Sequence, residues 1–347
     1  MSNDISNQAL LELINRPAFC VKDGQILQAN QMARQRTVQP GTPVADYLVR
    51  NPQAYENFSG GCLFLTLWIE GIPYPASVTS MEGYDLFLLD WENDSSRQAM
   101  ALASQQLRQS LSGLYAVLDT MKNGTDTAYM RQSLYQMHRT LCNMSDVARY
   151  DICGSAQTEP TNLTAFFAET VEKAQTMLEK AGYHLHYTAL PEVVMGMADR
   201  EILERSVLNL ISNAVKFSPK GSVLKATLVR SGKMLRFTLQ DPGDGIAPEV
   251  MQQVFSRYQR EPAIEDGRHG MGLGLSLVCM AAARHEGTVL MDQPPEGGTR
   301  VTMTVKVIPC PDQMVRSPML VFRYDYAGGH DHGLLELSDV LPADMYK

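Results

Sequence analysis

The sequence predicts a multidomain α+β protein with an α+β N-terminal part, a helical hairpin and a C-terminal α/β sandwich. Short strand patterns with turns fill residues 8–95, two helical stripes follow, and beyond residue 199 a helix precedes two glycine-rich turns. At 347 residues the chain is long enough for two or three domains. We expect the domains at residues 1–94, 95–152 and 153–308, followed by an extension over 309–347.

Composition narrows the class of protein. The chain is 44% hydrophobic and 20% charged, with a formal net charge of -8, which is typical of a globular protein and argues against nucleic acid as a partner. The longest apolar runs are far shorter than the ~20 residues of a membrane helix, and the N-terminus has no signal-peptide pattern. We therefore expect a cytoplasmic protein with no membrane span.

The N-terminal region reads as a small α+β domain. Two strands flank a turn at Lys22-Asp23-Gly24, and three more are expected near 62–70, 74–80 and 84–91. This order of elements resembles a PAS-type sensor fold. The resemblance contains no ligand motif, so a ligand-binding sensor and a dimerising spacer both stay open.

Two amphipathic helices are expected next. Apolar residues recur in steps of three and four over 97–121, including Leu107, Leu111 and Leu114, and again over 130–148. Two helices cannot cover both stripes, so pairing with a second copy into a four-helix bundle predicts a homodimer. The alternative is that the hairpin packs on its own chain.

The helix expected over 199–217 has a polar face beside its apolar stripe. Asn209, Asn213 and Lys216 are spaced by four and three residues, so their side chains converge. An amide oxygen can ligate Mg²⁺ and an ammonium group can bind phosphate. This face is therefore suited to a metal-bound nucleotide.

Two glycine-rich turns follow this helix. Asp241 is followed by Gly243 and Gly245, which allow the backbone to turn closely around a ligand. Further on, three alternate glycines open a helix whose N-terminal amides can receive phosphate oxygens; these are Gly270, Gly272 and Gly274. Each cluster alone is a weak signal, and their order is the stronger one.

The combination resembles the ATP-binding catalytic domain of the histidine kinase family, a sandwich of the type shared with gyrase. NLISNAVKFSP matches its N box, DPGDGI its G1 box, VFSRYQR its F box and GMGLGL its G2 box, and Gly298-Thr299 matches the final strand entry. The resemblance implies ATP and Mg²⁺ as cofactors. It implies that Asn213 ligates Mg²⁺, and that Asn209 and Lys216 flank it at the phosphates as catalytic residues.

The resemblance implies further roles around the nucleotide. Asp241 would accept a hydrogen bond from the adenine amino group, with Gly243, Gly245 and Thr299 around it. Residues 246–269 would form a mobile ATP lid anchored by Phe255. The remaining phosphate contacts would come from Gly270, Gly272, Gly274 and either Arg260 or Arg268.

The phosphoacceptor motif departs from the family pattern S-H-E-L-R-x-P-L. In the matching stretch, Ser104 to Leu111, Gln105 stands at the histidine position and Gln106 at the acidic one. A glutamine amide cannot accept a phosphoryl group as an imidazole does. Gln105 is expected to face solvent, opposite a core-facing Leu107.

His138 is the one histidine in the hairpin region and is a candidate for a relocated acceptor. Because it follows Met137, which we expect in the core, its ring is expected at the solvated helix surface.

Three functions remain open. The protein is a nucleotide-gated pseudokinase that controls a partner, an active kinase that uses His138 or an acceptor on another protein, or a phosphatase in which Gln109 orients water. The family's partner would be a response regulator or another signalling protein. In the extension, alternation from Leu320 to Tyr326 predicts a half-buried strand, for which we favour packing within the chain over docking of a partner.

Overall fold

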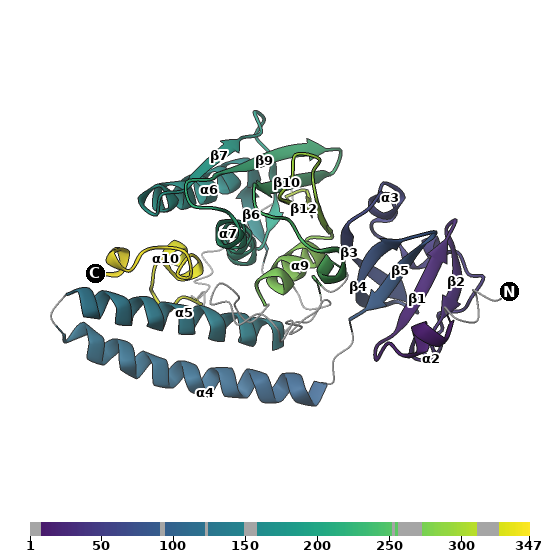
Figure 1. Cartoon of the computed structure of the whole chain (residues 1–347), viewed down its shortest axis with the longest axis horizontal. Coiled ribbons are helices and arrows are strands. Elements are labelled where there is room, and N and C mark those ends of the chain that lie inside the picture. The colour runs from purple at the N-terminus through teal and green to yellow at the C-terminus, as the bar shows by residue number, and fades with distance from the viewer. Residues whose placement is uncertain are drawn as a thin grey trace.

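The computed structural model describes residues 8–90, 94–121, 124–148, 158–251, 254–255, 273–310 and 326–347. Figure 1 shows strands β1 to β5 at one end, the long hairpin of α4 and α5 along the lower side, and a second group of strands and helices above the hairpin and beside β1 to β5. Among the described helices, none is both long enough and apolar enough to cross a membrane.

The N-terminal strands form close to where the sequence predicts them. They are β1 (Ala18–Lys22), β2 (Gln25–Ala29), β3 (Cys62–Ile69), β4 (Ile72–Met81) and β5 (Tyr84–Leu89), hydrogen-bonded antiparallel in the order β2-β1-β5-β4-β3. Two short helices, α2 (Gln31–Arg34) and α3 (Pro52–Glu56), and one 3-10 turn, η1 (Val44–Tyr47), lie between β2 and β3. Stacked rings of Phe19 and Phe87, 4.8 Å apart, lie at the centre of this core.

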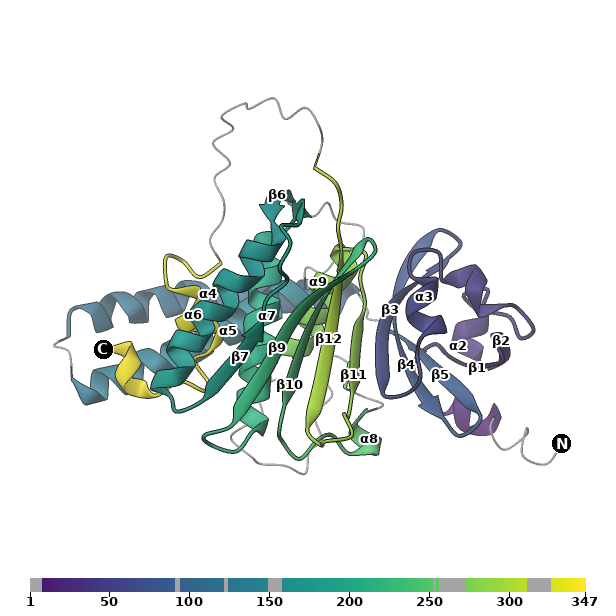
Figure 2. The same ribbon diagram turned by 90° about the horizontal axis from the view of Figure 1, so that it is seen from above.

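The second group of strands carries its helices on one face of the sheet (Figure 2). Its strands are β7 (His184–Thr188), β9 (Val223–Ser231), β10 (Met234–Asp241), β11 (Val289–Asp292) and β12 (Thr299–Lys306), and its helices are α6 (Leu163–Lys180), α7 (Arg200–Phe217) and α9 (Gly274–Arg284). A two-stranded sheet of β6 (Glu159–Asn162) and β8 (Met195–Ala198), and the short α8 (Pro248–Met251), complete this part.

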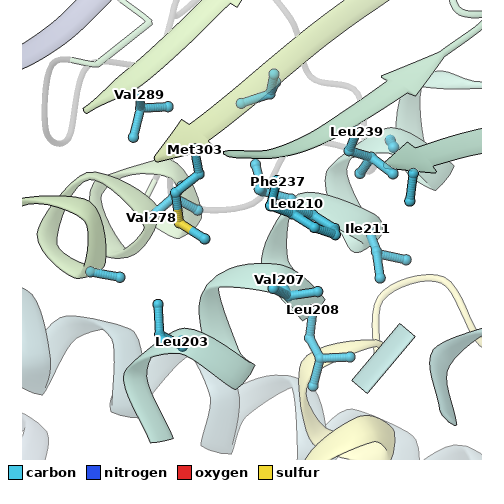
Figure 3. Close-up of a cluster of buried hydrophobic side chains, with 14 of the residues drawn as sticks. Leu203, Val207, Leu208, Leu210, Ile211, Phe237, Leu239, Val278, Val289 and Met303 are labelled. Atoms are coloured by element: carbon cyan, nitrogen blue, oxygen red, sulfur yellow. The ribbon is translucent and has the colours of Figure 1, made fainter. Parts of the chain in front are cut away.

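Alternation along the strands explains why helices cover one face only. Leu235, Phe237 and Leu239 of β10 point into the core, and their neighbours point outward. Figure 3 shows Phe237 against Leu210 and Ile211 of α7, whose apolar stripe has the helical spacing that the sequence predicts.

One sheet runs through both groups of strands. β3 pairs antiparallel with β11, with Phe64 opposite Val289 and Cys62 opposite Met291. The ten strands therefore have the order β2-β1-β5-β4-β3-β11-β12-β10-β9-β7. Sequence reasoning treated these regions as separate domains and did not foresee this junction.

The hairpin consists of α4 (Asp94–Asp119) and α5 (Thr125–Ala148). Its contact is made by Leu111, Tyr115, Leu118, Leu134 and Leu141. The other apolar residues of the expected stripes stay outside this contact: Leu107, Leu114 and Met137 are 53%, 53% and 54% exposed. Within one chain Leu107 is therefore uncovered, because α5 covers the adjacent face of α4; its place in the core of a four-helix bundle stays a prediction.

The extension packs within the chain. After residue 325 it forms α10 (His332–Glu336), which packs against both α5 and α7, and the 3-10 turn η2 (Ala343–Tyr346), which packs against α5 (Figure 1). Leu335, Leu337 and Leu341 are buried there, and Gln132 of α5 donates to the Leu341 carbonyl at 2.8 Å. The strand expected over residues 320–326 lies almost wholly outside the described residues.

Candidate functional site

Asp241 ends β10 beside the start of β12. The two residues Asp241 and Thr299 are cross-strand partners, so the Thr299 amide reaches the Asp241 Oδ1 atom at 3.3 Å, and the Gly243 amide donates to the same oxygen at 2.9 Å. The structure thus brings together three residues assigned to the adenine side. The carboxyl is buried, which raises its pKa, and the two amide donors act in the opposite direction.

The loop after Asp241 favours glycine at two positions for different reasons. A Cβ on Gly243 would lie 2.4 Å from the Phe217 carbonyl oxygen, and Gly245 has a φ of +80°. Because Phe217 ends α7, the Asp241 loop lies directly against the end of the Asn-bearing helix.

Asn209 faces away from the sheet and is completely buried. Its Oδ1 atom accepts from an Arg139 guanidinium nitrogen at 2.8 Å, and its Nδ2 atom donates to Glu336 Oε2 at 2.9 Å. A Cβ on Gly274, the first residue of α9, would lie 2.8 Å from Asn209 Oδ1. Asn209 therefore joins α7 to the hairpin, to the extension and to the start of α9.

Lys216 lies two turns further along α7, on the same face. Its Nζ atom pairs with Asp339 Oδ2 at 2.5 Å, and Arg139 reaches the same carboxylate oxygen at 2.7 Å. Asn213, the expected Mg²⁺ ligand, lies between Asn209 and Lys216 in sequence and is half-buried. The polar face of α7 that the sequence predicts is therefore real, and the extension covers it in part.

A buried ionic cluster supports this face. Glu336 has no exposed surface, and its two oxygens accept from Arg205 Nε at 2.9 Å and from Arg139 Nε at 3.1 Å. Arg205 also pairs with Asp146 and donates to Asn143 Oδ1 at 2.9 Å, both on α5. Buried charges persist in proteins when they are paired and hydrogen-bonded in this way.

The burial of these arginines and carboxylates was not predicted from the sequence, because charged residues on amphipathic helices usually lie on the solvent-exposed face. The nearest signal was Arg205, which falls among the apolar residues of the 199–217 pattern.

Several predicted residues fall outside the described part of the chain. These are Arg260, Arg268, Gly270 and Gly272, together with most of the expected lid. Phe255 is described and buried, and its ring makes an edge contact with Phe64 of β3 at 6.1 Å between centroids. Phe255, the residue expected to anchor the lid, thus contacts the N-terminal strands.

The hairpin positions differ from expectation at the histidine. Gln105 and Gln109 are exposed on α4, as expected for Gln105. His138, however, is only 5% exposed, whereas Met137 is 54% exposed, so the placement of its ring at the helix surface was wrong. The reason is that Tyr115 of α4 and His330 of the extension cover that face, with centroids 6.1 Å and 5.8 Å from His138.

Comparison with known proteins agrees with this geometry. Residues 198–309 match the family described as histidine kinase-, DNA gyrase B- and HSP90-like ATPase. The sensor-like histidine kinase SenX3 of Mycobacterium tuberculosis is 30% identical over 142 residues, which are 41% of this chain and 34% of that protein. The histidine protein kinase DivJ of Caulobacter vibrioides is 33% identical over 147 residues, 41% of this chain and 25% of that protein.

Among solved structures, full-length ShkA in complex with AMPPNP aligns with a TM-score of 0.49 at 20% identity, covering 62% of this chain and 46% of that one. The chain spans about a third of the length of SenX3 and a quarter of that of DivJ.

The α/β sheet with its Asn-bearing helix and Asp-Pro-Gly loop defines an ATPase domain of the histidine kinase and gyrase type. Residues 198–309 match this ATPase family, and over that part the chain is similar to sensor histidine kinases.

Proposed function

We propose that the protein binds Mg²⁺-ATP in this domain and acts as a nucleotide-gated signalling protein that lacks the family's phosphoacceptor. The observation that carries the proposal is the Asp241 carboxylate, fixed by the Gly243 and Thr299 amides next to the Asn-bearing face of α7. In this function the protein works as a homodimer that controls a response regulator or another signalling protein.

The donor set fits the nucleotide. Asp241 offers a buried carboxylate acceptor to an adenine amino group. Asn213 offers an amide oxygen to Mg²⁺, and Lys216 offers a positive charge to phosphate. When bound, ATP supplies a transferable phosphoryl group, and these residues hold and orient it.

The hairpin supports the assignment as a pseudokinase. The exposed residue at the acceptor position is Gln105, whose amide cannot take a phosphoryl group. The alternative acceptor, His138, has its ring packed against Tyr115 and His330, so an ATP domain would have to displace the extension to reach it.

The test is to incubate the protein with Mg²⁺ and γ-labelled ATP and to score bound nucleotide and covalent label together. We expect binding without label, and binding at least about tenfold weaker in Asp241→Asn, because the variant puts an amide donor in place of an acceptor. Asp244→Asn is the matched control, since Asp244 is an exposed carboxylate in the same loop. Acid-labile label that disappears in His138→Ala would favour an active kinase instead, and absence of binding would refute the nucleotide site.

A second candidate function is supported by the exposure of Gln109, one turn beyond Gln105 on α4. An exposed amide on the hairpin can orient water against an aspartyl-phosphate of a docked response regulator. Loss of aspartyl-phosphate from a cognate regulator should then require the full-length protein and vanish in Gln109→Ala. Equal loss with Gln109→Ala and with wild type would remove this candidate.

A further inference from the structure

Two cations from different parts of the chain meet at one carboxylate. Arg139 is on α5 of the hairpin and Lys216 is on α7 of the ATPase domain, and both bind Oδ2 of Asp339 in the extension, at 2.7 Å and 2.5 Å. The side chains of Arg139 and Lys216 are only 6% and 10% exposed, whereas that of Asp339 is 28% exposed. The Asp339 carboxylate is thus more accessible to solvent than the two cations that it binds.

The two buried cations, Arg139 and Lys216, need a negatively charged group between them. Burial lowers the pKa of Lys216, and the neighbouring Arg139 guanidinium lowers it further, because two like charges in a poorly solvated place repel each other. Asp339 opposes both effects. Burial would raise the pKa of its own carboxyl, but Arg139 and Lys216 outweigh burial and lower it.

The position of this cation pair points to the nucleotide. The far end of α7 lies against the Asp241 loop through Phe217, and Asn209 lies against Gly274 at the start of α9. A nucleotide that extends from Asp241 towards Gly274 therefore runs along the face of α7 that carries Lys216. Arg139 reaches this face from the hairpin, and its guanidinium also contacts Ser212 Oγ at 3.3 Å and Asn209.

We propose that Arg139 and Lys216 form a binding site for the terminal phosphate of a Mg²⁺-bound nucleoside triphosphate, and that Asp339 fills this site as an internal anion which the nucleotide displaces. The inference rests on the proposed ATP binding and deepens it. It assigns a ligand contact to the hairpin residue Arg139 and a function to the extension.

Asp339, Arg139 and Lys216 come from the extension, the hairpin and the ATPase domain, so exchanging the anion changes how these parts are connected. With Asp339 in place, the extension bridges hairpin and ATPase domain through its own carboxylates. With a phosphate in place, Arg139 and Lys216 are bridged by the nucleotide, and the segment around α10 loses two of its charged contacts with α5 and α7. Nucleotide binding is thereby coupled to release of residues 332–341, since both compete for the same cations.

The first experiment compares Asp339→Asn with Asp344→Asn by titration calorimetry. Asp344 is the matched control because it is an exposed carboxylate in the same extension. We expect Asp339→Asn to bind Mg²⁺-AMPPNP about tenfold more tightly than wild type, because the site is then no longer occupied by its own anion. Mg²⁺-ADP should change much less, since it has no terminal phosphate, and Asp344→Asn should match wild type with both nucleotides.

Arg139→Gln supplies the reciprocal test and should weaken Mg²⁺-AMPPNP more than Mg²⁺-ADP. Equal affinities in wild type and Asp339→Asn, or equal effects on the two nucleotides, would overturn the inference while leaving the proposed ATP binding intact. If no form of the protein binds either nucleotide, the proposed function itself fails.

A measurement on the wild-type protein avoids dependence on how the variants fold. The backbone amides of Leu335, Leu337 and Leu341 donate within the extension. Saturating Mg²⁺-AMPPNP should accelerate hydrogen exchange at these amides, whereas Mg²⁺-ADP should have a smaller effect. Unchanged or slower exchange with the triphosphate analogue would contradict displacement of Asp339.

Discussion

Gly298 shows how a single residue limits the adenine side of the site. Its φ is +79°, and a Cβ there would lie 1.8 Å from the Asp241 carbonyl oxygen. Gly297 also has a positive φ, +91°, but a Cβ there would have nothing within 4 Å. A substitution at either glycine strains the backbone, but only a substitution at Gly298 also causes a steric clash.

We expect Gly298→Ala to lower the free energy of unfolding by at least about 2 kcal/mol more than Gly297→Ala, because only the first forces β10 and the loop before β12 apart. Urea unfolding of both variants measures the difference. Gly298→Ala should also weaken nucleotide binding, since the Thr299 amide would move from Asp241. Equal losses of stability would mean that the close approach at Gly298 relaxes without cost.

Site residues that lie close together in the sequence could be predicted from it, whereas pairs of residues far apart in the sequence could not. Asp241 and Gly243 are two residues apart and act through one turn, so residue type and spacing suffice to group them. Arg139 and Glu336 meet across 197 residues of chain. Their charges alone are equally consistent with a solvated surface, and only the folded path of the extension distinguishes a buried pair from an exposed one.

At the scale of elements, the hairpin leaves a regular apolar face uncovered. Leu107 and Leu114 of α4, and Met121 just after its end, are spaced by seven residues and are 53%, 53% and 46% exposed. Met130 and Met137 of α5 repeat that spacing and are 51% and 54% exposed. This is the spacing of residues that pack helices into a bundle. It is the strongest support for the predicted homodimer, because the chain's own extension covers a different face of α5.

Leu114→Glu should therefore convert a dimer into a monomer, since it places a charge in the centre of that face. Light scattering or sedimentation at micromolar concentration gives the mass. Val193→Glu is the control: Val193 is 69% exposed on the ATPase domain, outside the hairpin. A wild-type protein that is already monomeric would refute the four-helix bundle, and a dimeric Leu114→Glu would place the interface elsewhere.

Apolar runs bounded by turn residues predicted β1 to β5 closely, but they did not predict the pairing of β3 with β11. Such runs show where a strand is buried, whereas the choice of its neighbour depends on the backbone edges that any strand presents. Cys62 and Phe64 belong to the longest apolar run in the sequence, which fits a strand with partners on both sides. The residue types in that run do not indicate that β11 is the neighbouring strand.

At the scale of the whole molecule, this pairing connects the N-terminal strands to the ATPase domain without passing through the hairpin. Phe64, opposite Val289 in the ladder, also touches the Phe255 ring at the expected base of the ATP lid. We therefore expect a change in the N-terminal strands to reach the ATPase domain through the shared sheet. Asn51 and Arg50 add contacts to Gly287 and Glu286 at the same junction.

Gly61→Ala tests whether the shared sheet transmits such a change. A Cβ on Gly61 would lie 2.3 Å from the Met291 carbonyl oxygen, whereas one on the adjacent Gly60, also at positive φ, would have nothing within 4 Å. Gly61→Ala should therefore separate β3 from β11 and speed hydrogen exchange of the β11 amides, while Gly60→Ala should not. Because Phe255 would lose its support from Phe64, we expect Mg²⁺-AMPPNP binding to weaken by about 0.5–2 kcal/mol in Gly61→Ala alone. Faster exchange in β11 with unchanged nucleotide affinity would show that the junction is structural only, and that signals reach the ATPase domain through the hairpin.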